Sequence, residues 1–378
     1  MRIVKPISIN DAILTSSTVP ENDFSDWLIG TTYAKGDRVN YIATISTVTI
    51  TIASPSVISF TDHGFLSGQI VTFTTTGTLP TGFSVGIAYY VVNPLTDSFN
   101  LAIEKDGQAI LTTGSQSGVH TCSGEYHSVF ESLRDSNLGS RPPTSLTNWI
   151  NTGPTNRWNM FDQSLSSQTQ NNDSIVTVFD IAGFANSVAL LNMRAKTVQI
   201  VVDDVVEGEV YNQSFDLKST SGITSYYAWF FEPIVQKRDL LVTDLPAFID
   251  STITVTVTDT GNTVKVGALV LGNNLNVGFT QYGMSMSIED FSVKSTDQFG
   301  RTTFIERDFR KTLSMNVWVD NSLVDETLNV LSDFRATPVV YEGSDSFSSS
   351  ILFGTSVAEM VIPGPVRGMM NITIEGLT

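Results

Sequence analysis

The side chains capable of acid–base or nucleophilic chemistry are few, and their spacing matches no common catalytic motif. The chain has three histidines, His63, His120 and His127, and none stands in an H-E-x-x-H or H-x3-H arrangement. The stretch Gly114–Gly118 has glutamine where a nucleophile elbow needs its central serine. The glycine patterns that bind phosphates or dinucleotides are missing from the sequence. We therefore expect no catalytic residues, no cofactor and no enzymatic activity.

The spacing of the carboxylates and the single cysteine give no indication of a metal site. With 38 acidic residues, pairs of carboxylates arise by chance, and one such pair, Glu125 and Asp135, lies near the aromatic motif described next. A glycosidase would place two such carboxylates across a cleft. Cys122 is the single cysteine, so an intramolecular disulfide and a cysteine-based zinc site are both excluded. The acidic turns lack the D-x-D-x-D-G spacing of a calcium loop.

The most specific pattern in the sequence is divided into two halves. The first half has a tryptophan, Trp27, followed by Y-x2-G-D-x-V-x-Y from Tyr33 to Tyr41. The second half consists of G-E-Y at Gly124–Tyr126, N-x-G-x2-P at Asn137–Pro142, and Trp149. Joined together, the halves resemble the short chitin-binding type of carbohydrate-binding module over residues 24–48 and 123–151. In that family one hairpin turn joins the halves, whereas here roughly eighty residues are inserted in that turn. Exposed turns commonly tolerate such insertions.

The resemblance implies that aromatic rings stack on the apolar face of a sugar. It implies that Trp149 and Tyr33 face the sugar, with Trp27 and Tyr126 more in the core. The alternative is that all four rings are structural, because so small a module has little other core. The sequence also departs from the family pattern, since one tryptophan stands at Trp149 where many members have a pair of aromatic residues.

Two further stretches resemble bacteriophage tail proteins. The first is G-P-T-N-R-W-N-M-F-D at Gly153–Asp162, in which Arg157 is expected to pair with Asp162 or a neighbouring carboxylate. Trp158 is expected to pack between modules. The second is the H-G-F-x-S-G-Q-x-V-x-F pattern from His63 to Phe73, which resembles a small β-module of phage tail and fibre proteins. That inserted module would act as an outward decoration or an adhesion surface.

Alternating apolar residues dominate the rest of the chain and predict strands. Ile253, Val255 and Val257 alternate with threonines before a predicted turn at Asp259–Asn262, which would make a β-hairpin. One segment, 322–335, instead has apolar residues at helical spacing, at Val324, Leu328, Leu331 and Phe334, with Ser322 as its N-cap. The polar run 163–174 is expected to be a linker or long loop.

The predicted fold is mainly β, with several small β-modules and a β-sandwich followed by a C-terminal β-sheet domain with one α-helix. The predicted domains are a split carbohydrate-binding-like module (1–48 plus 123–162), an inserted β-module (44–124), a jelly-roll-like sandwich (163–281) and a tail-type β domain (282–378).

The charge and composition of the chain limit the kinds of partner that it is expected to bind. The net charge is −17 and no basic cluster is present, so binding to a nucleic-acid backbone is not expected. The start of the chain lacks the apolar stretch of a secretory signal, and no run reaches bilayer length. We therefore expect synthesis in the bacterial cytoplasm and no membrane insertion.

These resemblances predict a virion structural protein of a bacteriophage tail. It would form part of the distal tail, baseplate or tail hub as a ring of identical copies, in contact with neighbouring tail proteins, with the N-terminal modules directed outward. The alternative is a host-attachment protein of the tail or tail fibre that binds a host surface glycan through the carbohydrate-binding-like module.

Overall fold

The computed structural model describes residues 1–181, 183–219, 223, 225–231, 233, 235–296, 298–335 and 337–378. The fold is mainly β, with several sheets and one longer helix near the C-terminus, which confirms the predicted fold class. The chain forms two compact units. The N-terminal unit comprises Ile9–Thr15 and Pro20–Trp158, and the C-terminal unit comprises Met1–Ser8, Ser16–Val19 and Asn159–Thr378.

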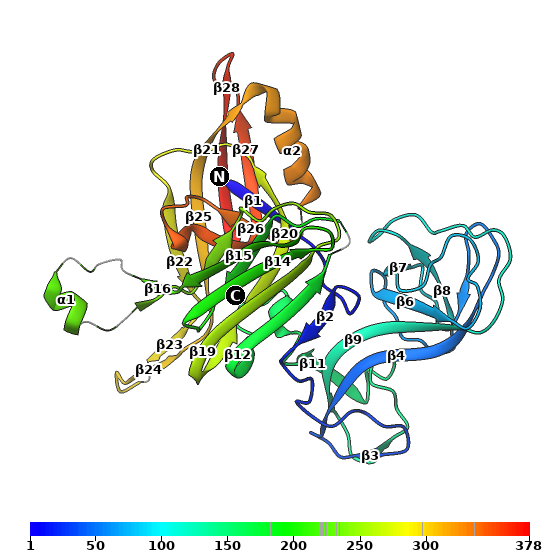
Figure 1. The fold of residues 1–378 in the computed structure, drawn as a ribbon. Helices are drawn as coiled ribbons and strands as arrows, with labels where there is room; N and C mark the ends of the chain where they lie inside the picture. Colours follow the sequence, from blue (N-terminus) through cyan, green and yellow to red (C-terminus); the bar gives the residue numbers. More distant parts are fainter. Residues whose placement is uncertain are drawn as a thin grey trace. The chain divides into compact units, whose positions relative to one another are not determined.

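Two long strands organise the N-terminal unit. Its strands are β3 (Thr32–Tyr33), β4 (Arg38–Ile50), β5 (Ile58–Ser59), β6 (Ile70–Thr75), β7 (Tyr89–Val92), β8 (Ser98–Ala102), β9 (His120–Ser132), β10 (Asn137–Leu138) and β11 (Trp149–Pro154). Antiparallel β4 and β9 pair from Arg38–Glu131 to Val48–His120 (Figure 1). The interrupting segment is therefore an extension of these two strands, which begin in one predicted module and continue into the other.

The inserted residues close a barrel with β4 and β9. The pairings run β9–β4–β5–β8–β7–β6, and β6 pairs back to β9, so the ring of hydrogen bonds has no free edge. The barrel has its own apolar core, which includes Phe65, Phe73 and Phe99. Gly124 on β9 lies against that core, because a Cβ there would clash with the Phe65 ring. Glycine at this position lets the Phe65 ring approach the backbone.

The C-terminal unit contains two large sheets. Its strands are β1 (Arg2–Pro6), β12 (Thr169–Asp180), β13 (Ser187–Leu191), β14 (Thr197–Asp204), β15 (Gly208–Asp216), β16 (Lys218–Ser219), β17 (Val235–Gln236), β18 (Leu240–Val242), β19 (Thr252–Val266), β20 (Ala268–Asn276), β21 (Phe279–Thr280), β22 (Ser285–Asp290), β23 (Val293–Thr296), β24 (Thr302–Ile305), β25 (Phe309–Asp320), β26 (Val339–Glu342), β27 (Ile351–Val361) and β28 (Arg367–Gly376). Its α-helices are α1 (Tyr226–Phe231) and α2 (Val324–Asp333), and short 3-10 turns occur at Asn159–Phe161, Asn321–Leu323 and Ser348–Ser350.

The larger sheet joins strands that are far apart in the sequence. Its order is β18-β13-β20-β1-β26-β27-β28-β25-β21, with β22 also paired to β25. The first strand of the chain, β1, thus lies between β20 and β26. This sheet includes strands from both of the predicted domains 163–281 and 282–378. The second sheet has the order β15-β14-β19-β12-β2, where β2 (Leu14–Ser17) reaches the unit through Ser16 and Ser17.

The predicted hairpin around Asp259–Asn262 is wrong. These residues lie inside the continuous strand β19, which pairs with β12 on both sides of them. The extra residues form a bulge opposite Asp173, whose carboxylate accepts a hydrogen bond from Gly261 N at 2.7 Å. The bulge accommodates the turn-forming residues, and strand pairing continues on both sides of it. The polar run 163–174, predicted as a linker or loop, is strand from Thr169 onward.

The predicted helix is present but shorter than 322–335. Helix α2 spans Val324–Asp333 and is preceded by a 3-10 turn that contains Ser322, so the predicted N-cap is wrong. Val324 and Phe334 are buried in the core of the larger sheet. Leu328, predicted on the same face, is 40% exposed. No helix within the described ranges is long and apolar enough to span a membrane.

Candidate functional site

The aromatic residues of the divided motif form the core of one end of the N-terminal unit. Trp149 is 1% exposed, and its Nε1 donates a hydrogen bond to Ser140 O at 2.9 Å. Its ring meets the ring of Tyr33 edge-on at 5.1 Å between centroids. Tyr33 is 8% exposed. Stacking on a sugar requires an exposed ring face, and this structure buries both rings that were expected to provide one.

Trp27 and Tyr126 pack against the same core and are half-buried. Trp27 lies 5.8 Å from Tyr41 between ring centroids. The Tyr126 hydroxyl donates to Gly64 O at 3.0 Å, and its ring contacts both this core and the barrel core. Burial raises the pKa of Tyr126. Tyr126 therefore joins the divided motif and the insertion into one apolar interior.

Next to this core, His127 is held in a strained and buried position. Its φ is +43°, a conformation that non-glycine residues rarely adopt. The β4–β9 register shifts between Tyr41 and Ala43, which places an extra residue on β9 at this point. His127 is 6% exposed, and the indole of Trp158 stacks on its ring at 4.2 Å between centroids. Backbone strain of this kind is common at functional sites.

Glu21 anchors one ring nitrogen of His127. The distance from His127 Nδ1 to Glu21 Oε1 is 2.9 Å, and Thr155 Oγ1 donates to the same oxygen at 2.7 Å. Arg157 Nη1 lies 3.6 Å from Glu21 Oε2. Burial raises the pKa of Glu21, but the hydrogen bond and charge of His127 outweigh it, so the pKa is lowered overall. Glu21 is thus a fixed carboxylate that orients the imidazole.

Arg157 thus pairs with Glu21, a carboxylate far away in the sequence. Asp162, its other expected partner, accepts hydrogen bonds from Ser164 N at 2.7 Å and Ser167 Oγ at 2.6 Å. Those contacts close a tight local turn. Burial raises the pKa of Asp162, and the hydrogen bonds from Ser167 and Ser164 act in the opposite direction.

A second carboxylate faces the other nitrogen of His127, and a third lies close to both. His127 Nε2 lies 3.2 Å from Asp11 Oδ1, and Asp11 N donates to Glu125 Oε2 at 3.2 Å. One ligand atom from each of Asp11, Glu125 and His127 lies within 4.8 Å of the others. Burial and the charge of Asp11 raise the pKa of Glu125 to about 7. Burial lowers the pKa of His127, but contacts with Asp11 and Glu21 outweigh it and raise the pKa to about 9. We call Asp11, Glu21, Glu125 and His127 the His127 cluster.

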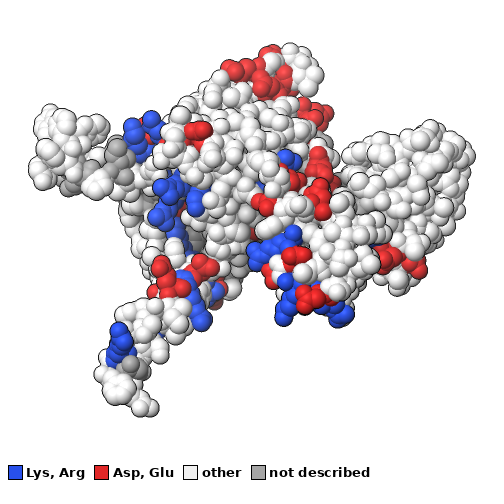
Figure 2. All heavy atoms as spheres, turned by 90° about the horizontal axis from the view of Figure 1, so that it is seen from below, with Lys and Arg blue, Asp and Glu red and all other residues white. Residues whose placement is uncertain are grey.

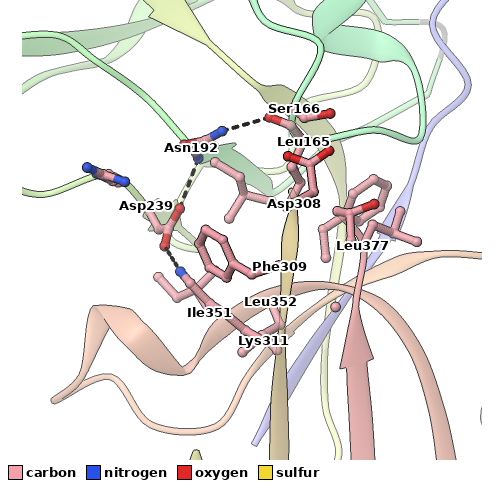
Figure 3. Close-up of a pocket in the computed structure, with 15 residues that line it drawn as sticks. Leu165, Ser166, Asn192, Asp239, Asp308, Phe309, Lys311, Ile351, Leu352 and Leu377 are labelled. Carbon is pink, nitrogen blue, oxygen red and sulfur yellow. Dashed lines mark hydrogen bonds and ion pairs between the residues drawn. The ribbon is translucent and has the colours of Figure 1, made fainter. Parts of the chain in front are cut away.

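A small cavity lies in the C-terminal unit between strands of the larger sheet and the adjoining loops. Its volume is about 130 Å³, and it is lined by residues that include Asp239, Lys311, Leu165 and Leu377. Lys311 Nζ lies 2.9 Å from Asp239 Oδ2, and Asn192 N donates to Asp239 Oδ1 at 2.9 Å (Figure 3). Both oxygens of the buried carboxylate are therefore already bound. This pattern indicates a structural contact between strand ends.

Exposed aromatic side chains occur on two extensions of the C-terminal unit, α1 and the β23–β24 hairpin, whose backbones Figure 1 shows. The exposed aromatic residues of α1 are Tyr226, Tyr227, Trp229, Phe230 and Phe231, each 62–87% exposed. Near β23 and β24, Phe299 is 94% and Phe304 is 71% exposed. Charged side chains gather in several groups on the face shown in Figure 2. The sequence of α1 has no charged residue. We call these two regions the aromatic extensions.

Comparisons with known proteins give only weak neighbours. No protein-family model and no curated protein matches the chain. A GH78-family rhamnosidase from Bacillus sp. GL1 is 10% identical over 76% of this chain and 36% of its own, with a TM-score of 0.23. The endosialidase of phage phi92 is 11% identical over 91% of this chain and 54% of its own, with a TM-score of 0.18. The chain thus spans about a third to a half of these neighbours, and such scores identify neither a shared fold nor a function.

The His127 cluster was not found from the sequence. Glu125 was considered only in a pair with Asp135, whose carboxylate instead accepts a hydrogen bond from Lys35 N at 3.0 Å. Asp11 and Glu125 are 114 positions apart, and Glu21 and His127 are 106 apart. A single sequence carries no local spacing that would connect them.

Proposed function

We propose that this chain is a structural protein of a bacteriophage tail that assembles with copies of itself through the aromatic extensions. The observation that supports this most directly is the exposure of five aromatic side chains on α1. Exposed apolar patches on a folded protein usually mark interaction surfaces. The sequence stretches at Gly153–Asp162 and 63–73 add the resemblance to tail proteins. A place in the distal tail, baseplate or tail hub, with neighbouring tail proteins as further partners, belongs to the same proposal.

The size of the hydrophobic effect explains why both extensions are needed. Burying one aromatic side chain gains about 2 kcal/mol, so the five rings of α1 would together contribute on the order of 10 kcal/mol. Association costs an estimated 4–15 kcal/mol in lost freedom. Helix α1 alone therefore roughly offsets that cost. The exposed rings of the β23–β24 hairpin supply the additional burial that makes a stable assembly.

The adhesion function is less well supported by the site. Its predicted contact residues, Trp149 and Tyr33, are buried in the aromatic core. The barrel then serves as an outward decoration of the assembled protein.

The test is the oligomeric state of the purified chain across a range of concentrations, measured by size-exclusion chromatography with light scattering. We expect a defined oligomer for the natural chain. A triple variant, Trp229→Ser, Phe230→Ser and Phe231→Ser, should be monomeric. The matched control changes three exposed apolar residues of the N-terminal unit, Leu66→Ser, Ile87→Ser and Leu95→Ser, and should assemble normally. A natural chain that stays monomeric at high concentration and is absent from virions by mass spectrometry would exclude the proposed function.

A further inference from the structure

We propose that Asp11, Glu125 and His127 bind a divalent transition-metal ion, of which Zn²⁺ is the best match. Their candidate ligand atoms already lie within 4.8 Å of one another. A tetrahedral Zn²⁺ at about 2.1 Å from each ligand holds them about 3.4 Å apart. The required contraction is small, and the side chain of Asp11, which is 53% exposed, has room to make it.

The buried imidazole provides the independent evidence for a ligand. The side chain of His127 is 8% exposed, and its Nε2 satisfies hydrogen-bond geometry with no atom in the part of the chain that the structure describes. This nitrogen faces the Asp11 carboxylate at 3.2 Å. The contact with Asp11 is thus an ion pair without good hydrogen-bond geometry. A bound metal ion would replace it with a direct bond to the nitrogen lone pair.

The other ring nitrogen is held as in known metal sites. A histidine that binds a metal almost always donates its second N–H to a carboxylate or carbonyl, which sets the tautomer and the ring orientation. Here Nδ1 lies 2.9 Å from Glu21 Oε1. The Nδ1 proton can therefore stay on Glu21's side of the ring while Zn²⁺ displaces the Nε2 proton into solvent and binds that nitrogen. Glu21 is fixed in turn by Thr155, and Trp158 covers one face of the ring.

The donor atoms select the class of metal. One imidazole nitrogen with two carboxylates suits Zn²⁺, Mn²⁺ or Co²⁺, whereas Ca²⁺ and Mg²⁺ prefer shells made only of oxygen. Three carboxylates surround His127, and Arg157 is the cation that the structure pairs with one of them, Glu21. A divalent ion would therefore neutralise charge that the site concentrates. It would also tie the segment Ile9–Thr15 to β9 within the N-terminal unit.

The experiment uses the full-length chain after treatment with a chelator and dialysis into metal-free buffer. Titration with ZnCl2 by isothermal calorimetry should give one ion per chain, and thermal unfolding should shift upward with added ZnCl2. Glu21→Gln should weaken Zn²⁺ binding by about 10- to 100-fold. Asp11→Asn and Glu125→Gln should weaken it at least as much. Glu104→Gln removes an exposed carboxylate elsewhere in the same unit and should leave affinity within about twofold.

Two outcomes would overturn the proposal. One is the absence of stoichiometric Zn²⁺ binding, with the same unfolding temperature before and after chelation. The cluster would then be an ion-paired imidazolium between Asp11 and Glu21. The other is Zn²⁺ binding that is unchanged in both Asp11→Asn and Glu125→Gln, which would place the ion elsewhere. These two positions are suitable for the test because neither side chain belongs to an apolar core, so the variants are expected to fold. Circular dichroism verifies that they do.

Discussion

Trp149 illustrates how the environment of one residue distinguishes a binding role from a structural one. Its ring is 1% exposed, contacts Tyr33 and bonds Ser140 O. Replacement by alanine would leave a large cavity, so we expect Trp149→Ala to lower the free energy of unfolding of the N-terminal unit by about 3–5 kcal/mol. Urea denaturation followed by far-ultraviolet circular dichroism measures this loss.

A matched surface change separates the two roles. Leu66 is 74% exposed in the same unit, and Leu66→Ala should change the free energy of unfolding by less than about 0.5 kcal/mol. If Trp149→Ala were as mild as Leu66→Ala, the ring would not be a core residue, and sugar contact at Trp149 would become the better interpretation.

At the scale of single elements, helix α2 shows what apolar periodicity predicts correctly and what it does not predict. Helical spacing placed Leu328 and Phe334 on one apolar face. The structure buries Phe334 to 7% exposure and leaves Leu328 40% exposed. We therefore expect Phe334→Ala to cost about 3–5 kcal/mol of unfolding free energy and Leu328→Ala about 1 kcal/mol or less. Guanidinium denaturation of the two variants checks the difference, and equal losses would show that both residues are packed.

The strands show the same limit of sequence-based prediction. Alternation of Ile253, Val255 and Val257 correctly located a strand, because side chains on one face of a sheet repeat every second residue. The sequence Asp259–Asn262 has every feature of a turn, yet β12 pairs with the residues before and after it. Whether such a segment turns or bulges depends on the partner strand and on Asp173, which is far away in the sequence. The His127 cluster was missed for the same reason.

Sequence reasoning left open whether the rings of the divided motif bind a sugar or form a core. It identified Trp27, Tyr33, Tyr126 and Trp149 as one group, and the structure does bring them into one core. The direction in which each ring faces depends on its contacts with β3, β10 and the loop at Ser140. These contacts cannot be predicted from composition. The exposure of α1 could not be predicted from the sequence either, because the run Tyr226–Phe231 has the apolar composition of a buried segment.

At the scale of the whole molecule, each compact unit has apolar cores of its own. The barrel and aromatic cores belong to the N-terminal unit, and the core that includes Phe334 belongs to the C-terminal unit. Domains with separate cores commonly unfold as separate cooperative units. We expect differential scanning calorimetry to resolve two transitions. Trp149→Ala should lower the temperature of one transition, and Phe334→Ala should lower that of the other. A single transition that shifts with either substitution would show that the two units fold as one.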